Sequence, residues 1–591
     1  MRRRVFSLSA VLLGAALAAS AQTTPSPASP TTNWPQWGQN ARHTGAVSTV
    51  GQRAARILAS LVYDPFVAQS VADPLNFGGL LVHYQAPLLQ GNTVYMEFKT
   101  GQYTTMDHWE TQIWNERRLS WQNGSLVQQW NFQSDWKPVP YGSLSSGRGP
   151  SWEPVFHAAI SGESVYVPGF GGTVYKLDKD DGEVEAHYNP FGTSVDPNIF
   201  LTGPITADTS GNVYYNAVKL DTSGQGTAWD NDVLNSWLVK VTEDGTVTKA
   251  TYASLVPGAP PPTGAHCLGV FTTAQLPWPP TPDAVPPSID CGSVRTALNI
   301  APAVGSDGTI YVPAVHHFSS RTAYMLAVKA NLTPKWQTSM RDRMHDGCNV
   351  YLPPNGTPGG CRTGAHTGVD PAQNRPGAGR VIEDGTYSPT IAPDGSIFFG
   401  TYARYNWAQG HMLKFSASGQ FLASYIFGWD ITPAIYSHDG TYSVVMKDNH
   451  YSGLGSYCDT DAICPPDRTA SDPSNPESFF ITQLSKDLVP EWSFQNTNQF
   501  SCHRNPDGTL TCVQDHPHGF EWCINAPAVD GHGVVYGNSE DGSLYTINQG
   551  GGLRDQLFLN LALGAAYTPL AISTDGKIYT ENDGILFVVG Q

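Results

Sequence analysis

One pattern of apolar and polar positions recurs along the chain. A small or polar residue and a proline precede three or four apolar residues, and a turn centred on Asp-Gly or an equivalent leads into an alternating aromatic strand. A second apolar strand, a glycine turn and a strand that often ends in Trp or Tyr follow after a variable gap. The alternation in Val165-Tyr166-Val167 has the two-residue period of a half-buried β-strand. Each unit therefore predicts four short antiparallel strands.

The clearest copy of the unit begins at Ala301-Pro302, turns at Ser306-Asp307-Gly308 and ends at Lys335-Trp336. Four short strands in about 40–50 residues are typical of a β-propeller blade. Eight copies occur, and their starting prolines are Pro87, Pro154, Pro204, Pro302, Pro389, Pro433, Pro527 and Pro569. The sequence therefore predicts an all-β fold, an eight-bladed β-propeller in which insertions lengthen some units. Trp130, Trp336 and Trp492, near strand ends, are interpreted as blade-to-blade packing.

The last copy is one strand short. Three strands follow Pro569, near Leu570–Ser573, Lys577–Glu581 and Ile585–Val589, and the sequence then ends. The apolar run Ile57–Tyr63 precedes the first unit and is suited to supply the fourth strand. We expect this N-terminal strand to close the ring, because an open last blade would expose an unpaired edge.

The N-terminal residues resemble a secretory signal peptide. Arg2 to Arg4 form a positive head, Val11 to Ala18 an apolar stretch, and Ala19-Ser20-Ala21 a small-residue cleavage site. The apolar stretch is too short to span a bilayer, and no Cys follows the cleavage site to accept a lipid. We expect a signal peptide over residues 1–21 and a periplasmic or extracellular protein without membrane insertion.

The composition agrees with one ring of short strands rather than several domains. The 591 residues include 59 Gly, 45 Pro, 16 Trp, 26 Tyr and 23 Phe, which disfavours both a helical bundle and a disordered chain. We expect a Pro/Ser/Thr-rich linker over residues 22–33 and a single propeller over residues 34–591. The net charge of −17 argues against nucleic acid as a partner, and we expect a monomer.

Nine cysteines fit an oxidising compartment. No C-x-x-C spacing of a metal site occurs, so disulfides that tie down long loops are the better interpretation. Cysteines close in sequence form four candidate pairs: Cys267–Cys291, Cys348–Cys361, Cys458–Cys464 and Cys502–Cys512. Pairing of Cys512 with Cys523 is an equally plausible alternative to Cys502–Cys512.

The large insertions are predicted to gather on one face of the ring. In a propeller, the loops between the second and third strands and the crossovers to the next blade lie on the same face. The insertions fall in these two groups: Phe98–Glu110, Lys219–Asn235, Ser254–Leu298, Ser339–Gly385, Lys447–Ser478 and Gln495–Cys523. Loops on a rigid scaffold often carry function, so this face is the expected binding face. The alternative is that the loops only cap the ring.

Two motifs resemble a known superfamily. The segment from Trp34-Pro35-Gln36-Trp37 to His43-Thr44-Gly45, and the unit from Val165 to Glu183, are similar to pyrroloquinoline-quinone-like repeat propellers. That superfamily contains eight-bladed quinoprotein alcohol dehydrogenases and the non-enzymatic propeller subunit of the outer-membrane barrel-assembly machinery. The chain lacks the adjacent Cys-Cys pair and the C-x-x-C-H haem motif of the dehydrogenases, and the lipid-accepting Cys of the assembly subunit.

The resemblance also implies candidate site residues at the channel mouth, where each innermost strand begins. In quinoproteins, carboxylate and amide groups near such positions hold Ca²⁺, and a Trp stacks on the quinone. By this resemblance Glu153, Asn299, Asp430 and Asn525 would bind Ca²⁺, and Trp152, Tyr387 and Tyr567 would contact pyrroloquinoline quinone. The alternative is ordinary polar lining of a wet channel.

Histidines are enriched in the insertions. His316-His317, His345, His366, His450, His503, His516 and His518 are interpreted either as metal ligands or, in the simpler view, as solvent-exposed loop residues.

Two functions remain open from the sequence. The first is a binding or scaffold propeller whose loop-rich face engages a protein or glycan, which the missing quinone and haem motifs favour. The second is an enzyme, either a divergent quinoprotein-type dehydrogenase or another carbohydrate-active propeller, with its site at the channel mouth.

Overall fold

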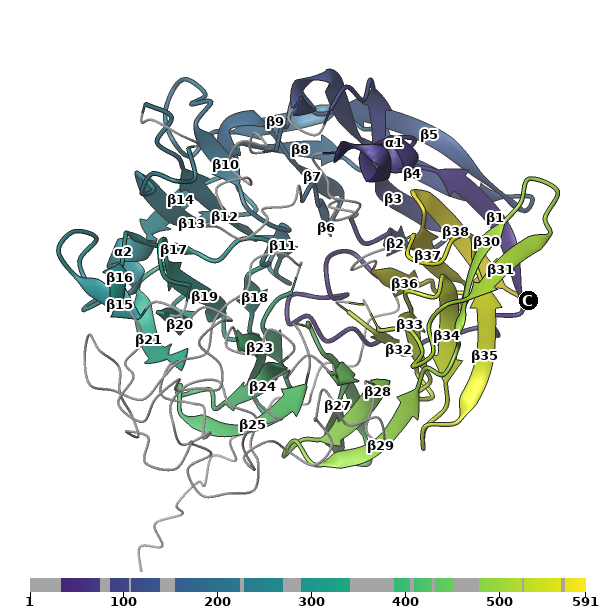
Figure 1. Ribbon diagram of the computed structural model, residues 1–591. Helices are drawn as coiled ribbons and strands as arrows, with labels where there is room; N and C mark the ends of the chain where they lie inside the picture. The colour runs from purple at the N-terminus through teal and green to yellow at the C-terminus, as the bar shows by residue number, and fades with distance from the viewer. Residues whose placement is uncertain are drawn as a thin grey trace, which may run out of the picture.

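The computed structural model describes most of the chain as a closed ring of β-sheets arranged around a central axis (Figure 1). The described residues are 33–74, 85–105, 108–138, 155–223, 228–268, 288–320, 322–340, 387–403, 409–427, 431–450, 478–522, 524, 526–564 and 569–591. The predicted signal peptide 1–21 and nearly all of the predicted linker lie outside them, so both stay predictions. Within the described residues, no helix is long and apolar enough to cross a membrane.

Eight antiparallel sheets form the ring, as the repeat predicts, and we number these blades along the chain. Blade 1 contains β2 (Leu88–Gln90), β3 (Thr93–Gly101), β4 (Gln112–Gln122) and β5 (Ser125–Gln133). Blade 2 contains β6 (Ala159–Ser161), β7 (Ser164–Pro168), β8 (Val174–Asp178) and β9 (Val184–Tyr188). Blade 3 contains β10 (Ile199–Leu201), β11 (Thr206–Ala207), β12 (Val213–Lys219), β13 (Asn235–Val241) and β14 (Val247–Thr251). Blade 4 contains β17 (Val294–Thr296), β18 (Ala303–Val304), β19 (Ile310–His316), β20 (Ala323–Val328) and β21 (Pro334–Ser339).

The second half of the ring repeats this arrangement. Blade 5 contains β22 (Thr390–Ile391), β23 (Ile397–Ala403), β24 (Gln409–Phe415) and β25 (Phe421–Phe427). Blade 6 contains β26 (Ala434–His438), β27 (Thr441–His450), β28 (Ser478–Ser485) and β29 (Pro490–Gln495). Blade 7 contains β32 (Ala528–Val529), β33 (Val535–Asn538), β34 (Ser543–Ile547) and β35 (Leu553–Phe558). Blade 8 contains β36 (Leu570–Ile572), β37 (Ile578–Asn582), β38 (Ile585–Gly590) and β1 (Arg56–Val62).

Two hairpins and a few short helical segments lie outside the blades. The hairpins are β15 (His266–Leu268) with β16 (Ser288–Asp290), and β30 (Phe500–Arg504) with β31 (Leu510–Gln514). The helical segments in the described chain are α1 (Val67–Ala72), α2 (Tyr252–Leu255), η2 (Trp109–Thr111) and η4 (Phe170–Gly172).

Two of the predicted disulfides are confirmed. Cys267 is bonded to Cys291 beside the first hairpin, and Cys502 is bonded to Cys512 across the second. The bond between Cys502 and Cys512 excludes the alternative pairing of Cys512 with Cys523. The predicted pairs Cys348–Cys361 and Cys458–Cys464 lie outside the described residues.

The turn chemistry read from the sequence forms the tight turn between the two inner strands of a blade. In blade 4 the Asp307 carboxylate accepts a hydrogen bond from the backbone N–H of Thr309 at 3.0 Å. In blade 5 Asp394 does the same for Ser396 at 2.9 Å. Such side-chain-to-backbone bonds two residues along the chain are how Asp stabilises a turn, so the repeated Asp-Gly pairs stabilise the turns between the inner strands.

Tryptophans in the outermost strands join neighbouring blades, as predicted. The indole N–H of Trp130 in blade 1 donates to the Lys179 carbonyl of blade 2, and that of Trp336 in blade 4 donates to the Ala417 carbonyl of blade 5, both at 2.9 Å. Each ring lies flat over a glycine of the next blade. A Cβ at Gly182 would lie 2.8 Å from the Trp130 ring, so only glycine allows this approach.

The first and last strands of the described chain complete blade 8. β1 pairs antiparallel with β38, with Arg56 opposite Gly590 and Val62 opposite Ile585. The sheet order is β1-β38-β37-β36, so the segment Ile57–Tyr63 supplies the strand that the last unit lacks. In Figure 1 the purple start of the described chain lies beside the yellow end.

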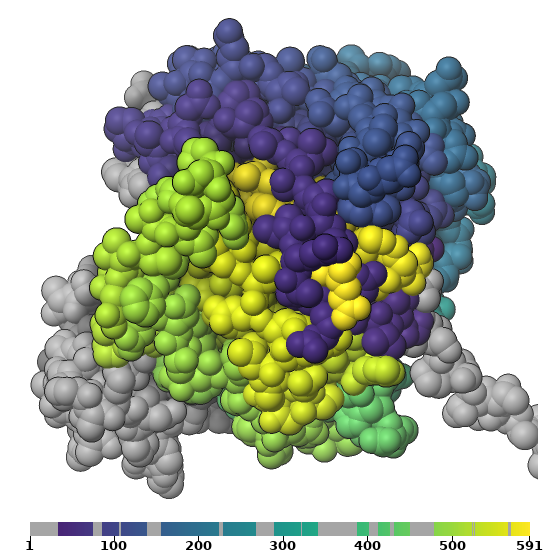
Figure 2. All heavy atoms as spheres, turned by 90° about the vertical axis from the view of Figure 1, so that its right-hand side faces the viewer, coloured from purple at the N-terminus to yellow at the C-terminus, as the bar shows by residue number. Residues whose placement is uncertain are grey.

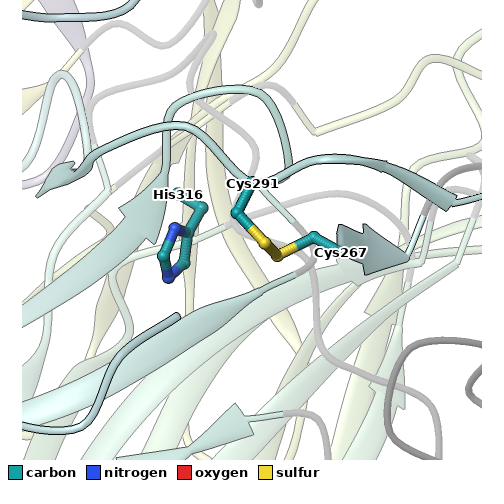
Figure 3. Close-up of side chains that lie close together, drawn as sticks. All are labelled: Cys267, Cys291 and His316. Carbon is teal, nitrogen blue, oxygen red and sulfur yellow. A yellow bond between two sulfur atoms is a disulfide. The ribbon is translucent and has the colours of Figure 1, made fainter. Parts of the chain in front are cut away.

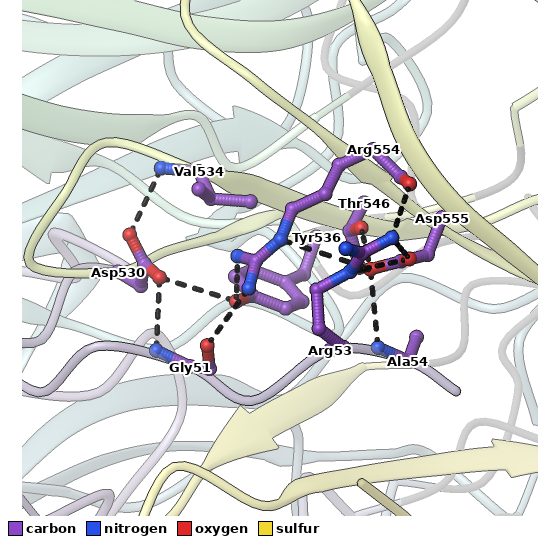
Figure 4. Close-up of polar contacts among 9 residues, drawn as sticks. All are labelled: Gly51, Arg53, Ala54, Asp530, Val534, Tyr536, Thr546, Arg554 and Asp555. Atoms are coloured by element: carbon purple, nitrogen blue, oxygen red, sulfur yellow. Dashed lines mark hydrogen bonds and ion pairs between the residues drawn. The ribbon is translucent and has the colours of Figure 1, made fainter. Parts of the chain in front are cut away.

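The chain segment before β1 is held against blade 7 by polar contacts (Figure 4). The backbone N–H of Gly51 donates to Asp530 at 2.8 Å, and the guanidinium of Arg53 donates to Asp555 at 2.7 Å. The backbone N–H of Ala54 also donates to Asp555, at 3.2 Å. The same stretch of chain therefore bridges blade 7 and blade 8 before it enters the sheet.

Asp530 is the buried centre of this attachment, so Asp530→Ala should weaken the ring. Its carboxylate accepts from the N–H groups of Gly51, His532 and Val534 and from the Tyr536 hydroxyl. Leaving these buried donors unpaired should lower the free energy of unfolding by about 2–4 kcal/mol. Urea denaturation followed by Trp fluorescence measures this loss, and hydrogen exchange should accelerate at Gly51.

Asp180→Ala is the matched control, because its side chain is 67% exposed. Equal stability of the Asp530 and Asp180 variants would contradict the structural role assigned to Asp530.

Candidate functional site

Five of the seven residues predicted at the channel mouth lie outside the described part of the chain. These are Trp152, Glu153, Asp430, Asn525 and Tyr567. Their proposed roles toward Ca²⁺ and pyrroloquinoline quinone stay predictions.

The other two predicted site residues are buried in the ring. Asn299 has a left-handed backbone with a φ of 60°, and its N–H donates to the Thr202 carbonyl at 2.6 Å. The Tyr387 ring stacks on Phe399 at 5.4 Å, within the apolar layer between blades 4 and 5. One amide and one phenol fall short of the six to eight oxygen ligands that Ca²⁺ takes. The described residues therefore do not by themselves define the predicted calcium or quinone site.

A disulfide and a histidine form the tightest group of metal-ligand residue types in the described chain (Figure 3). One ring nitrogen of His316 and the sulfurs of Cys267 and Cys291 all lie within 4.8 Å of one another. Nδ1 of His316 is hydrogen-bonded to the Gly292 carbonyl at 2.9 Å, and burial lowers the histidine's pKa. Metal ions bind cysteine as the thiolate, which neither sulfur provides while they are bonded to each other. In this oxidised form the three residues therefore have a structural role: the disulfide links two segments of the chain, and His316 is hydrogen-bonded to Gly292.

His317 is likewise fully engaged. Arg295 donates through Nε to Nδ1 of His317 at 3.0 Å, and the other ring nitrogen donates to the Trp229 carbonyl at 2.9 Å. Burial and the positive charge of Arg295 lower the pKa of His317 to about 3, so the ring is neutral. The interpretation of His316 and His317 as exposed loop residues is therefore wrong, because β19 continues to His316 and both side chains are buried. His503 and His518 are exposed, as that interpretation expects.

The sequence analysis missed a group of buried carboxyl side chains between blades 1 and 8. Glu97 on β3 lies directly opposite Glu116 on β4, and Glu581 extends from β37 of the neighbouring blade. All three are at most 1% exposed. A glutamate in the middle of the apolar strand Thr93–Gly101 is the signal that could have revealed them, since a charge is rarely buried without a purpose or a partner.

These carboxyl groups have few hydrogen-bond partners. Gln85 donates through Nε2 to Glu116 at 3.0 Å, and the Tyr63 hydroxyl donates to Glu581 at 3.1 Å. The second oxygen of Glu116, the second oxygen of Glu581 and both oxygens of Glu97 accept no hydrogen bond within the described chain. The nearby backbone N–H of Gln85 lowers the pKa of Glu97, but by less than burial raises it.

Burial therefore favours the protonated form of all three groups. Desolvation raises the pKa of Glu116 to about 8 and raises the pKa values of Glu97 and Glu581 well above the ordinary range. The neighbouring Lys99 ammonium is bound to the Asp64 carboxylate at 2.8 Å, with both side chains at most 2% exposed. Because Lys99 is paired with Asp64, its positive charge only partly offsets the rise in the pKa of Glu97.

A pH-dependent stability follows from Glu116. Between pH 4.5 and about 8 the unfolded chain releases a proton that the folded chain keeps, so the free energy of unfolding should fall with rising pH. One such group contributes a slope of about 1.4 kcal/mol per pH unit. Glu116→Gln keeps a neutral side chain at every pH, so the variant should gain stability over wild type at pH 8 and little at pH 4.5.

Urea unfolding at several pH values measures the difference between the two proteins. Glu163→Gln is the control, because that side chain is 81% exposed. A Glu116→Gln curve parallel to wild type across this range would refute the buried, protonated state of Glu116.

Comparison with known proteins concerns the fold. No protein-family model matches the chain, and no curated protein matches it. Among solved structures, a europium-containing methanol dehydrogenase shares 11% identity with a TM-score of 0.49, covering 93% of this chain and 89% of that chain. The quinohemoprotein alcohol dehydrogenase from Comamonas testosteroni shares 11% identity with a TM-score of 0.49, covering 95% and 82%. BamB from Moraxella catarrhalis shares 9% identity with a TM-score of 0.39, covering 91% and 99%.

Sequence identities and TM-scores this low support no conclusion about the activity of this chain. The eight sheets of this chain form the ring that the sequence repeat predicts. The chain is therefore an eight-bladed β-propeller.

Proposed function

We propose that the protein is an exported binding and scaffold propeller that captures an extended segment of a partner protein. The capture site is the β30–β31 hairpin, which belongs to the insertion Gln495–Cys523 that the sequence assigns to the binding face. The hairpin lies at the outer edge of the ring in Figure 1, and Figure 2 shows the yellow-green atoms of this part of the chain at the surface.

The free edge of β31 is the observation that carries this proposal. β31 pairs with β30 in an unbroken register from Leu510–Arg504 to Gln514–Phe500, and with no other strand in the described chain. All five of its residues are exposed. Its outer edge contains no Lys, Pro or bulge, the devices that usually block pairing with another strand. An extended peptide can add to such an edge through backbone hydrogen bonds.

Apolar side chains flank this edge on both faces of the hairpin. Phe500 is 45% exposed and Leu510 is 47% exposed, and the strand register places them on the same face. Val513, at 60% exposed, lies on the opposite face. Side chains of this kind are suited to cover alternate apolar residues of an added strand.

The hairpin is also rigid, which lowers the entropic cost of binding. The disulfide Cys502–Cys512 ties its two strands together. Arg504 anchors it to the end of β35 and the residue that follows, donating through its guanidinium to the carbonyls of Phe558 at 3.0 Å and Leu559 at 2.9 Å.

Acidic residues at both ends of β31 specify the charge of the partner. Asp507 precedes the strand and Asp515 follows it. Hydrogen bonds from Thr509 and Ser501, respectively, lower the pKa values of these two carboxyls, so both are ionised at neutral pH. We therefore expect a partner strand with an apolar centre and Lys or Arg at its ends.

A labelled peptide of alternating Val and Thr with a Lys at each end tests this function by fluorescence anisotropy. Val513→Lys should weaken binding by about tenfold or more, because it places a charge on the pairing edge. Val489→Lys is the matched control, since Val489 is equally exposed at 60% but lies in blade 6. An affinity that Val513→Lys leaves unchanged would sink the proposal.

The alternative, a divergent quinoprotein-type dehydrogenase, is tested on the same protein. Pyrroloquinoline quinone and Ca²⁺ are added, and the absorbance spectrum and dye-linked oxidation of alcohols and sugars are recorded. A bound-quinone spectrum with turnover would overturn the view that the protein only binds and scaffolds.

A further inference from the structure

Blade 3 lies on the opposite side of the ring from the β30–β31 hairpin (Figure 1). It carries a pocket. Its volume is about 320 Å³, at the small end of the range for small-molecule sites. Lys219 and Asn235, the two ends of the insertion read from the sequence, both line it. A pocket of this size fits a single ring-sized ligand rather than a protein segment.

The strand register brings the lining side chains to one face of the blade. Lys219 at the end of β12 lies opposite Asn235 at the start of β13, and Trp237 follows two positions later on the same face. Lys249 on β14 lies opposite Val239, which shares the face of Trp237. These positions are fixed by the sheet itself, so the pocket rests on a rigid floor.

The connection between β9 and β10 supplies the other wall. Phe191 packs on Trp237 with ring centroids 4.9 Å apart, and the Lys249 ammonium lies 5.5 Å from the Phe191 ring. Asp196 in the same connection forms an ion pair with Lys219 at 2.7 Å. The pocket therefore combines an aromatic wall with charged groups at fixed positions.

Hydrogen-bond donors dominate the polar lining. The side-chain oxygen of Asn235 accepts from the Ser236 N–H at 2.8 Å, whereas its amide N–H groups make no hydrogen bond within the described chain. The indole N–H of Trp237 makes none there either. Lys249 donates to the Pro190 carbonyl and keeps further N–H groups for a ligand.

The charge balance of the pocket is opposite to that of the whole chain. Two lysines face one carboxylate here, although the chain has 50 acidic and 33 basic residues. The hydrogen bond from Lys219 lowers the pKa of Asp196, so this carboxylate is ionised and already paired. Lys249 is left as the positive charge without a carboxylate partner among the lining residues. Charged donors of this kind bind carboxylates strongly.

We propose that this pocket is a binding site for a carboxylate carried on a six-membered ring. Lys249, Asn235 and Trp237 donate hydrogen bonds to the carboxylate, and the ring of the ligand packs against Phe191 and the apolar residues beside it. Two sources share this chemistry, a hexuronic acid unit of a glycan and an aromatic acid.

Isothermal titration calorimetry of the full exported protein with D-glucuronate, benzoate and D-glucose tests the site. At least one of the two acids should bind saturably, and glucose, which lacks the carboxylate, should bind at least about tenfold more weakly. Stronger binding of glucuronate identifies a sugar site, and stronger binding of benzoate identifies an aromatic-acid site; both outcomes support the proposal.

Two variants assign the binding to the pocket. Lys249→Met should weaken binding of the preferred acid by about tenfold or more, and Trp237→Phe should weaken it less, because an aromatic ring remains although the indole N–H and part of the ring system are lost. Lys240→Met is the matched control on the same strand as Trp237, since Lys240 lies on the opposite face and bonds to the Ala330 carbonyl. Melting temperatures verify that each variant is folded.

The proposal is overturned if neither acid binds at concentrations up to about 10 mM. It is equally overturned if folded Lys249→Met and Trp237→Phe bind the preferred acid as tightly as wild type, or if glucose binds as tightly as the acids.

Discussion

The pairing of β1 with β38 is the constraint on which the rest of the ring depends. It joins residues that are more than 500 positions apart, such as Ile57 and Val589. Each blade buries its two faces against its two neighbours, so one missing strand would expose an edge and loosen two apolar layers. The contacts of Gly51 and Arg53 with blade 7 fix the direction from which β1 enters this sheet. Closure therefore depends on the backbone pairing of β1 with β38 and on the polar contacts that hold the preceding segment against blade 7.

The seam between blades 8 and 1 also carries the costliest groups of the described ring. Glu97 and Glu581 approach each other from the two blades, together with the ion pair of Lys99 and Asp64. An apolar layer surrounds them, in which Val94 and other residues of β3 pack against blade 8. Burying carboxyl groups with few hydrogen bonds is unfavourable, so this seam is less stable at neutral pH than an apolar seam of the same size. The ring therefore has buried carboxyl groups with few hydrogen bonds at the seam between its closing blade and blade 1.

The fold followed from the sequence because strand alternation and Asp-Gly turns are local signals that repeat eight times. The candidate sites did not, because each depends on which distant residues become neighbours. Glu97 was overlooked although it interrupts an apolar strand, and His316 was placed in a loop because the end of β19 cannot be read from the sequence. The partner of Cys512 stayed open because spacing alone does not choose between two cysteines. The pocket depends on the pairing of Lys219 with Asn235 and on the β9–β10 connection that places Phe191 beside Trp237. No local sequence motif predicts either of them.

The order of the strands in blade 8 also constrains how the chain can fold. During synthesis, β1 is made more than 500 residues before its partner β38, so it must remain unpaired until the blades between them have been made. Contacts between such distant residues form slowly because a very long loop must close first. Every product of synthesis or proteolysis that lacks β38 therefore leaves an open edge in blade 8, and only a chain that contains both β1 and β38 can protect it.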